Sequence, residues 1–229
     1  MIRPRRSLIG LAPVLAAAAL LIPPVAADAA NQRWFINGVV AETQHSGVID
    51  WGTLSVENHF LGKLQCTTVS SGAVWNEGET GFGATALTTI GACTSEPTPC
   101  EGAFLAAEGP LELIKGAPKR GKSSLPWQEE VFREESGEKL RHVKIKEVKL
   151  TLVMPCLNLE LPFEGTLEPI YRDGDRNGLS PSRLVFQGKG GTTSFLTTKA
   201  LGTGEEENAL HFVGEVAQDG TSVQLITAE

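Results

Sequence analysis

The chain of 229 residues lacks most of the features that would assign it to a known chemistry. It has two methionines and one tyrosine, and aromatic residues make up 6% of its composition. Basic charge is not in excess, since the formal net charge is −7. This argues against nucleic acid or an anionic membrane surface as the main partner, because both need a basic footprint. The G-x-S-x-G, H-E-x-x-H, P-loop and G-x-G-x-x-G motifs are absent as well, so no common enzyme class is predicted.

A long apolar run occurs only once, at Leu8–Ile22, and it follows a basic start at residues 3–6. At about 15 residues the run is shorter than the roughly 20 that span a bilayer. The small residues Ala27-Asp-Ala29 come next and fit the A-x-A cleavage rule. We therefore expect residues 1–29 to be a secretory signal peptide cleaved after Ala29, with Ala27 as the second choice. Arg5-Arg6 leaves twin-arginine export open beside the general secretory route.

Removing that peptide would leave residues 30–229 as an acidic chain with a net charge of about −9. No other stretch approaches membrane-spanning length, so we expect no membrane span after cleavage. The predicted location is extracellular or at the cell envelope. The one linker-like stretch, Lys115–Ser124, is basic and contains glycine and proline, and a domain boundary there stays open. We expect residues 30–229 to form a single domain.

The four cysteines are an even number in a chain predicted to enter an oxidising compartment, so disulfides are expected. Cys93 and Cys100 bound a short loop with two prolines. This favours a Cys93–Cys100 bridge, and it leaves Cys66 to pair with Cys156 by elimination. A zinc site is disfavoured because the paired C-x2-C spacing is missing.

Period-two alternation and turn residues recur along residues 30–229, whereas no segment has a convincing helical stripe. The sequence predicts an all-β, disulfide-bonded antiparallel sandwich or barrel of roughly ten to thirteen short strands. Asn37-Gly38 and Asp219-Gly220 predict two-residue hairpin turns. The alternation in 140–156 changes phase at Lys146-Glu147, which predicts a β-bulge. Residues 127–135 are compatible with either a helix or a strand.

Metal and catalytic signals are weak. Residues 173–178 match the first half of a calcium loop through the oxygen ligands Asp173, Asp175 and Asn177. Position twelve of that loop should be a glutamate and is Leu184 instead, so a turn is favoured and no cofactor is predicted. The four histidines are scattered, and His142 is expected to be exposed.

Two surface features suggest ligands. The basic stretch contains Lys115, Lys119, Arg120 and Lys122, a set that suggests contact with an anionic cell-wall polymer. The four tryptophans suggest a carbohydrate platform, although core packing is expected for most of them.

Several short motifs occur in an order that resembles a group of uncharacterised exported proteins of actinobacterial type. These motifs are Trp34–Gly38, Ile49–Leu54, Cys66, the pair Cys93 and Cys100, Leu125–Trp127, Cys156 and Phe163–Pro169. The resemblance covers most of residues 30–229 and implies a secreted β-rich domain with no assigned role. The 173–178 pattern is not part of it.

The sequence thus predicts a secreted, non-enzymatic binding or structural protein whose extracellular or envelope partner is unknown. A carrier with a barrel cavity for a small apolar ligand is the first alternative. The second is a hydrolase whose carboxylates lie far apart in sequence, for which Glu160, Glu164 and Asp173 are the candidates.

Overall fold

The computed structural model describes residues 32–36, 39–97, 99–108, 111–114, 117–133, 141–173, 181–188, 195–200, 208–219 and 223–227. The predicted signal peptide, residues 1–29, lies outside these ranges. The described strands are β1 (Gln32–Ile36), β2 (Val39–Val40), β3 (His45–Asn58), β4 (Gly62–Glu77), β5 (Thr80–Glu96), β6 (Ala103–Ala106), β7 (Leu111–Ile114), β8 (Ala117–Arg120), β9 (Trp127–Arg133), β10 (Arg141–Met154), β11 (Leu159–Leu167), β12 (Ile170–Arg172), β13 (Arg183–Gln187), β14 (Phe195–Leu196), β15 (Leu210–Asp219) and β16 (Val223–Thr227). The 3-10 turn Pro155–Leu157 joins β10 to β11.

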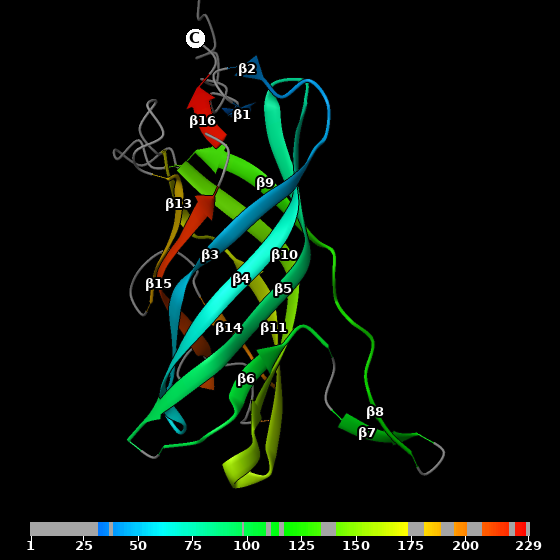
Figure 1. Ribbon diagram of the computed structural model, residues 1–229, viewed down its shortest axis with the longest axis vertical. Coiled ribbons are helices and arrows are strands. Elements are labelled where there is room, and N and C mark those ends of the chain that lie inside the picture. Colours follow the sequence, from blue (N-terminus) through cyan, green and yellow to red (C-terminus); the bar gives the residue numbers. More distant parts are fainter. Residues whose placement is uncertain are drawn as a thin grey trace, which may run out of the picture.

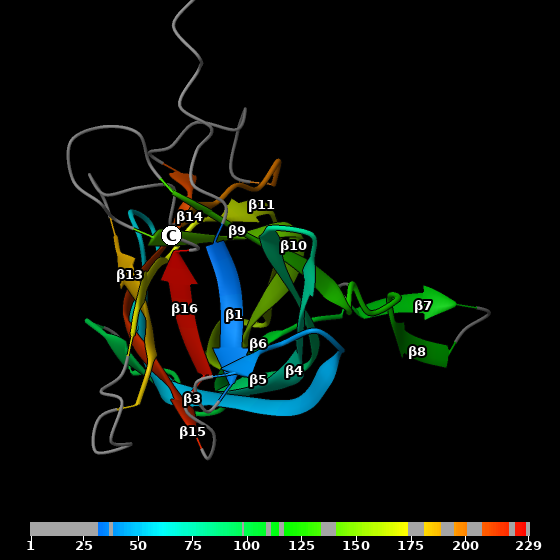
Figure 2. The ribbon, with the colours of Figure 1, turned by 90° about the horizontal axis from the view of Figure 1, so that it is seen from above.

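The main sheet has eleven antiparallel strands and closes on itself (Figures 1 and 2). Starting at β3, the ring continues through β4 and β5 to β9 and β6, which both pair with β10. On its other side β10 pairs with β11 and β12, and β12 leads through β13 and β15 back to β3. The all-β antiparallel prediction is confirmed, and of its two forms the structure has the barrel. Closure pairs most of the described strands on both sides, which matters because an unpaired edge is the part of a sheet most prone to unwanted pairing.

Strand alternation places the core inside the barrel. On β3 the buried residues Val48, Leu54 and Val56 have the same parity as Asp50, and the residues of the opposite parity are exposed or half-buried. The same pattern holds on β10 after the predicted bulge, which is confirmed by a register shift between Ile145 and Val148 and by a positive φ of 53° at Glu147. The bulge returns the apolar set to the interior, because an extra residue reverses the facing of those that follow it.

A three-stranded sheet, β16–β1–β2, lies across one end of the barrel (Figure 2). Its strand β1 turns Gln32, Trp34 and Ile36 toward the interior. Asn76 on β4 holds β1 in place, since its carboxamide accepts from the Trp34 amide at 2.8 Å and donates to the Trp34 and Ala41 carbonyls. The Trp34 ring meets the Tyr171 ring edge-on at 5.2 Å. We call this sheet the cap.

The pairing of β1 with β2 confirms a hairpin around Asn37-Gly38, although the two turn residues lie outside the described residues. The predicted hairpin at Asp219-Gly220 is wrong. β16 pairs with β1 in the cap, whereas β15 stays in the barrel between β13 and β3. A turn dipeptide predicts a local change of direction and does not determine which strand the chain meets next.

Residues 127–133 form strand β9, so the strand alternative for this segment is the correct one. The expected exposure of His142 is wrong, because only 1% of its surface is accessible. Its ring stacks on that of Phe132 from the neighbouring strand at 5.3 Å. The outer face of β10 is therefore covered at this point, which alternation within one strand does not reveal.

Candidate functional site

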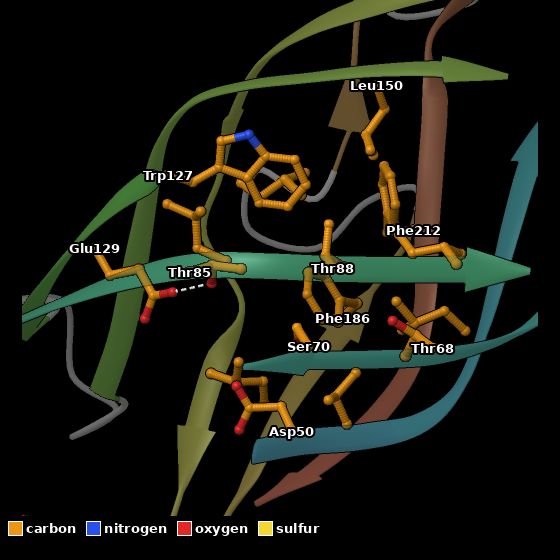
Figure 3. Close-up of a pocket in the computed structure, with 16 residues that line it drawn as sticks. Asp50, Thr68, Ser70, Thr85, Thr88, Trp127, Glu129, Leu150, Phe186 and Phe212 are labelled. Atoms are coloured by element: carbon orange, nitrogen blue, oxygen red, sulfur yellow. Dashed lines mark hydrogen bonds between the residues drawn. The ribbon is translucent and has the colours of Figure 1, made fainter. Parts of the chain in front are cut away.

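The barrel encloses a cavity of about 50 Å³ (Figure 3). Its walls come from β3, β4, β5, β9, β10, β11, β13 and β15. Much of the lining is apolar and includes Trp127, Phe186 and Phe212. The remainder consists of four hydroxyl groups and two carboxyl groups, from Asp50, Thr68, Ser70, Thr85, Thr88 and Glu129. The lining thus combines acidic and aromatic side chains around one cavity.

Asp50 reaches the cavity because it has the inward parity of Val48 and Leu54 on β3. The residue has intermediate exposure overall, yet its Oδ1 atom is shielded from solvent and has no hydrogen-bond partner. The pKa of Asp50 is raised to about 7, chiefly by burial and also by the nearby Glu129 carboxyl, while a hydrogen bond from Gln218 lowers it in part. Gln218 is held in turn by the Tyr171 hydroxyl, which donates to its Oε1 at 3.0 Å.

Glu129 faces the cavity from β9 with the same parity as Trp127 and Val131. It lies opposite Gly83 on β5, where a Cβ atom would come within 2.9 Å of a Glu129 carboxyl oxygen. The glycine therefore makes room for the acid. The pKa of Glu129 is also raised to about 7, because burial outweighs the lowering effect of the Thr85 hydroxyl, which donates to Oε1.

The two carboxyl groups have lost hydration that the protein only partly replaces. A buried carboxylate needs a cation or several donors to offset desolvation. Asp50 has one donor contact, from Gln218, and the donor to Glu129 is Thr85. Perturbed acids in a cavity with convergent hydroxyl groups are typical of a binding site. The site can accept hydrogen bonds from a ligand and can neutralise a positive charge.

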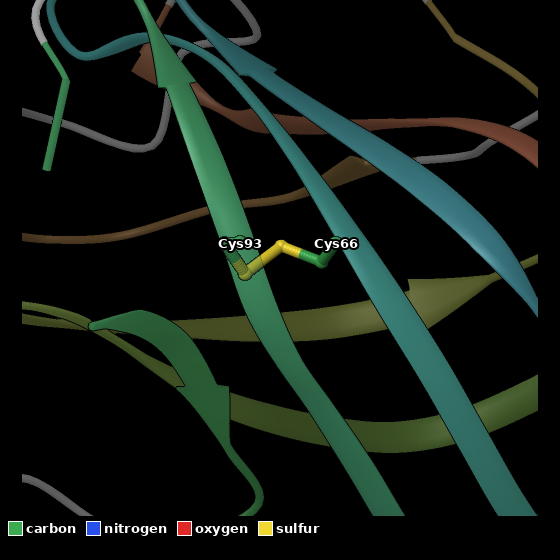
Figure 4. Close-up of a disulfide and its surroundings, with 2 residues drawn as sticks. All are labelled: Cys66 and Cys93. Atoms are coloured by element: carbon green, nitrogen blue, oxygen red, sulfur yellow. A yellow bond between two sulfur atoms is a disulfide. The ribbon is translucent and has the colours of Figure 1, made fainter. Parts of the chain in front are cut away.

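The predicted cysteine pairs are wrong, although all four cysteines form disulfides as expected. The bridges are Cys66–Cys93, with Cα atoms 4.0 Å apart, and Cys100–Cys156, with Cα atoms 5.4 Å apart. Figure 4 shows the first bridge between the neighbouring strands β4 and β5. Residue Ala92 has a φ of 48° at a register shift, and this irregularity brings Cys93 opposite Cys66.

The three acids considered for hydrolysis do not converge on the cavity. Glu160 accepts from both terminal nitrogens of Arg120, at 3.2 and 3.1 Å. Glu164 lies 3.8 Å from the ammonium group of Lys149, and Asp173 forms an ion pair with Arg141. Each of these acids is thus matched to a cation outside the barrel interior.

The other candidate sites have mixed outcomes. Asp175 and Asn177 of the calcium pattern lie outside the described residues, and within those ranges no group of three or more acidic, histidine or cysteine residues could hold a metal ion. Lys115 also lies outside them. Among the tryptophans, Trp34 and Trp127 are core residues, whereas 49% of the Trp51 surface is accessible.

Sequence reasoning missed both Asp50 and Glu129. A signal existed for Asp50, because it shares the parity of the apolar residues on its strand. For Glu129 the same signal depends on assigning 127–133 as a strand, which the sequence left open.

The comparisons with known proteins give no relatives from which to transfer a role. No family model, no curated protein and no solved structure matches the chain. Among the described residues, the structure contains no helix of the length and apolar character needed to cross a membrane. The site must therefore be interpreted from its own chemistry.

Proposed function

We propose that the protein is an exported, non-enzymatic binding protein whose barrel takes a small organic cation between Asp50 and Glu129. The observation that supports this most directly is the Asp50 Oδ1 atom, which is enclosed at the cavity without a hydrogen-bond partner. An ammonium group offers the positive charge that the two acids lack, and N–H donors in addition to Gln218 and Thr85. The aromatic rings in the same wall suit its methyl or methylene groups.

The size of the cavity favours a small ligand over the alternatives. An apolar cavity of about 150 Å³ accommodates benzene. At about 50 Å³, this cavity has room for a methylammonium-sized group but not for a lipid chain or a sugar ring. A carrier of larger apolar ligands and a glycoside hydrolase would both need the barrel to open first.

Export is supported by the sequence pattern of residues 1–29 and is compatible with the two disulfides, since such bridges persist in oxidising compartments. The test is secretion of the full chain from a bacterial host, followed by mass measurement of the secreted product. A mature N-terminus at residue 30 or residue 28 is expected. Retention of residues 1–29 on the secreted product would contradict the proposal.

Ligand binding is tested by thermal unfolding at pH 8.5, where both acids are ionised. In about 100 mM methylammonium chloride, a dissociation constant of about 10 mM would add about 1.4 kcal/mol of stability. That corresponds to a rise in Tm of about 3–5 °C relative to the same concentration of tetramethylammonium chloride, whose cation is too large for the cavity. Because the two salts are used at the same ionic strength, the difference in Tm measures how well the cation fits the cavity.

The double variant Asp50→Asn, Glu129→Gln should lose this difference. Glu215→Gln, which changes an exposed acid paired with Arg183, should keep it. Equal Tm values in the two salts for the unmodified protein would overturn the proposed ligand class.

A further inference from the structure

A groove of about 250 Å³ lies on the outside of the barrel, over the pair β10 and β11. Lys149 and Glu164 form its floor together with Pro162, and Lys149 lies directly opposite Glu164 in the ladder. Residues 108 and 122 belong to one wall, and residues 197–200 belong to the other. The second wall is fixed to the floor by two backbone hydrogen bonds between Thr197 and Glu164, at 2.8 and 3.0 Å.

Three lysines surround this groove in a protein whose net charge is −7. Lys149 is 3.8 Å from Glu164, and both side chains are more than half exposed, so their attraction is weak and easily exchanged. Among the cationic side chains that the structure describes, only Lys122, Arg172 and Lys199 take part in no ion pair. Two of these three line the groove.

We propose that this groove is a second binding site, which takes an anionic sugar through its phosphate or carboxylate group. Lys122 and Lys199 approach the anion from opposite walls, and Lys149 lies beneath it. Glu108 and Glu164 accept hydrogen bonds from sugar hydroxyls. An inorganic anion without hydroxyl groups would not make these hydrogen bonds. Pro162 is exposed in the floor and offers an apolar surface to the C–H groups of the ring.

The site also revises the basic set inferred from sequence. Arg120 is occupied by Glu160 and lies over the Phe104 ring, so it is not free for a ligand. Of the two members of that set whose side chains the structure describes, Lys122 lines the groove, where Lys149 and Lys199 come from other parts of the chain.

The test is an NMR titration of the mature protein with glucose 6-phosphate and with glucuronate, compared with neutral glucose and with inorganic phosphate. Saturable shifts of the amides of Lys149, Thr197 and Lys199 are expected with at least one of the two anionic sugars. The arm that saturates identifies whether phosphate or carboxylate is preferred. Glucose should give no saturation, and inorganic phosphate should bind several-fold more weakly.

The double variant Lys122→Gln, Lys199→Gln should weaken binding about tenfold, because it removes two charge-assisted contacts. Arg172→Gln is the matched control, since it removes an unpaired cation outside the groove and should change affinity less than twofold. The cavity variant Asp50→Asn, Glu129→Gln should bind the anionic sugar normally, which separates this site from the cation site.

Three outcomes would overturn the proposal: no saturable binding of either anionic sugar up to about 20 mM, equal binding of glucose, or an equal loss in Arg172→Gln. Because charge-neutral substitutions at exposed sites usually change stability by less than about 0.5 kcal/mol, the variants are expected to fold.

Discussion

The two acids in the cavity should make the protein less stable as the pH rises from 4 to 8. In the folded chain the pKa of Asp50 rises from 3.8 to about 7, and that of Glu129 rises from 4.5 to about 7. Between these values the folded state keeps protons that the unfolded state has released. The free energy of unfolding must then fall with increasing pH and level off above about pH 8. Below about pH 3 both states are protonated and the acids have no effect.

The expected magnitude follows from the shifts. One pKa unit corresponds to 1.36 kcal/mol, so each acid costs about 3 to 4 kcal/mol once it is ionised. The Glu129 carboxyl contributes to the Asp50 shift, so the two costs are not independent and the combined loss is smaller than their sum. Even about 3 kcal/mol is a large part of the stability of a typical domain. It would lower Tm by roughly 10 °C in a chain of this length.

The assay is urea unfolding, followed by tryptophan fluorescence at pH 5 and at pH 8.5. Asp50→Asn and Glu129→Gln each replace an acid by an amide of the same shape. Each variant should be about 3 to 4 kcal/mol more stable than the unmodified protein at pH 8.5, and the difference should fall to about 1 to 2 kcal/mol at pH 5. Glu215→Gln should follow the unmodified profile, because that acid is exposed and paired with Arg183.

A flat profile between pH 5 and pH 8.5 would refute the assignment of a costly buried acid pair. So would amide variants that keep the full slope, since the slope would then originate in other groups.

Three further results are expected. Asn76→Ala removes two hydrogen bonds to β1 and one to Ala41, so amide exchange in β1 should accelerate by at least tenfold while the barrel strands change little. Trp127→Ala should cost about 3 to 5 kcal/mol in urea unfolding, whereas Trp51→Ala, at a half-exposed outer position, should cost less than about 1 kcal/mol. Non-reducing peptide mapping should recover a Cys100–Cys156 link, and replacing that pair with serine should cost about 4 kcal/mol, slightly more than loss of the other bridge, because it closes the longer loop.

The sequence was sufficient for features that depend on one strand at a time. Alternation predicted the all-β class, and the phase change at Lys146-Glu147 predicted the bulge that the structure contains. The parity of Val48 and Leu54 also places Asp50 inside, so this residue was within reach of the same reasoning.

Pairing between strands required information that the sequence does not carry. The register at the turn between β4 and β5, where Glu77 faces Thr80, would place Cys66 opposite Gly91 if it continued unchanged. Two register shifts occur along this pair, and each adds one residue to β5. They move Cys93 opposite Cys66, which is why a short loop between cysteines was a poor guide to the bridge. The closed strand order of the ring and the pairing of β16 with the cap also depend on contacts between residues far apart in the sequence.

The two proposed sites have opposite charge and meet on a single strand. Leu150 of β10 faces the acid-lined cavity, and its neighbour Lys149 faces the lysine-lined groove. Side chains on a strand alternate between faces, so one residue of register decides which site each side chain enters. The bulge before Val148 sets that phase. Without it, Lys149 would enter the apolar interior next to Trp127 and Leu150 would face solvent, at a cost that no ion pair in the groove could offset. Both sites therefore require the bulge at Lys146-Glu147. The phase change at this position in the sequence indicates which side chains of β10 face the interior and which face the groove.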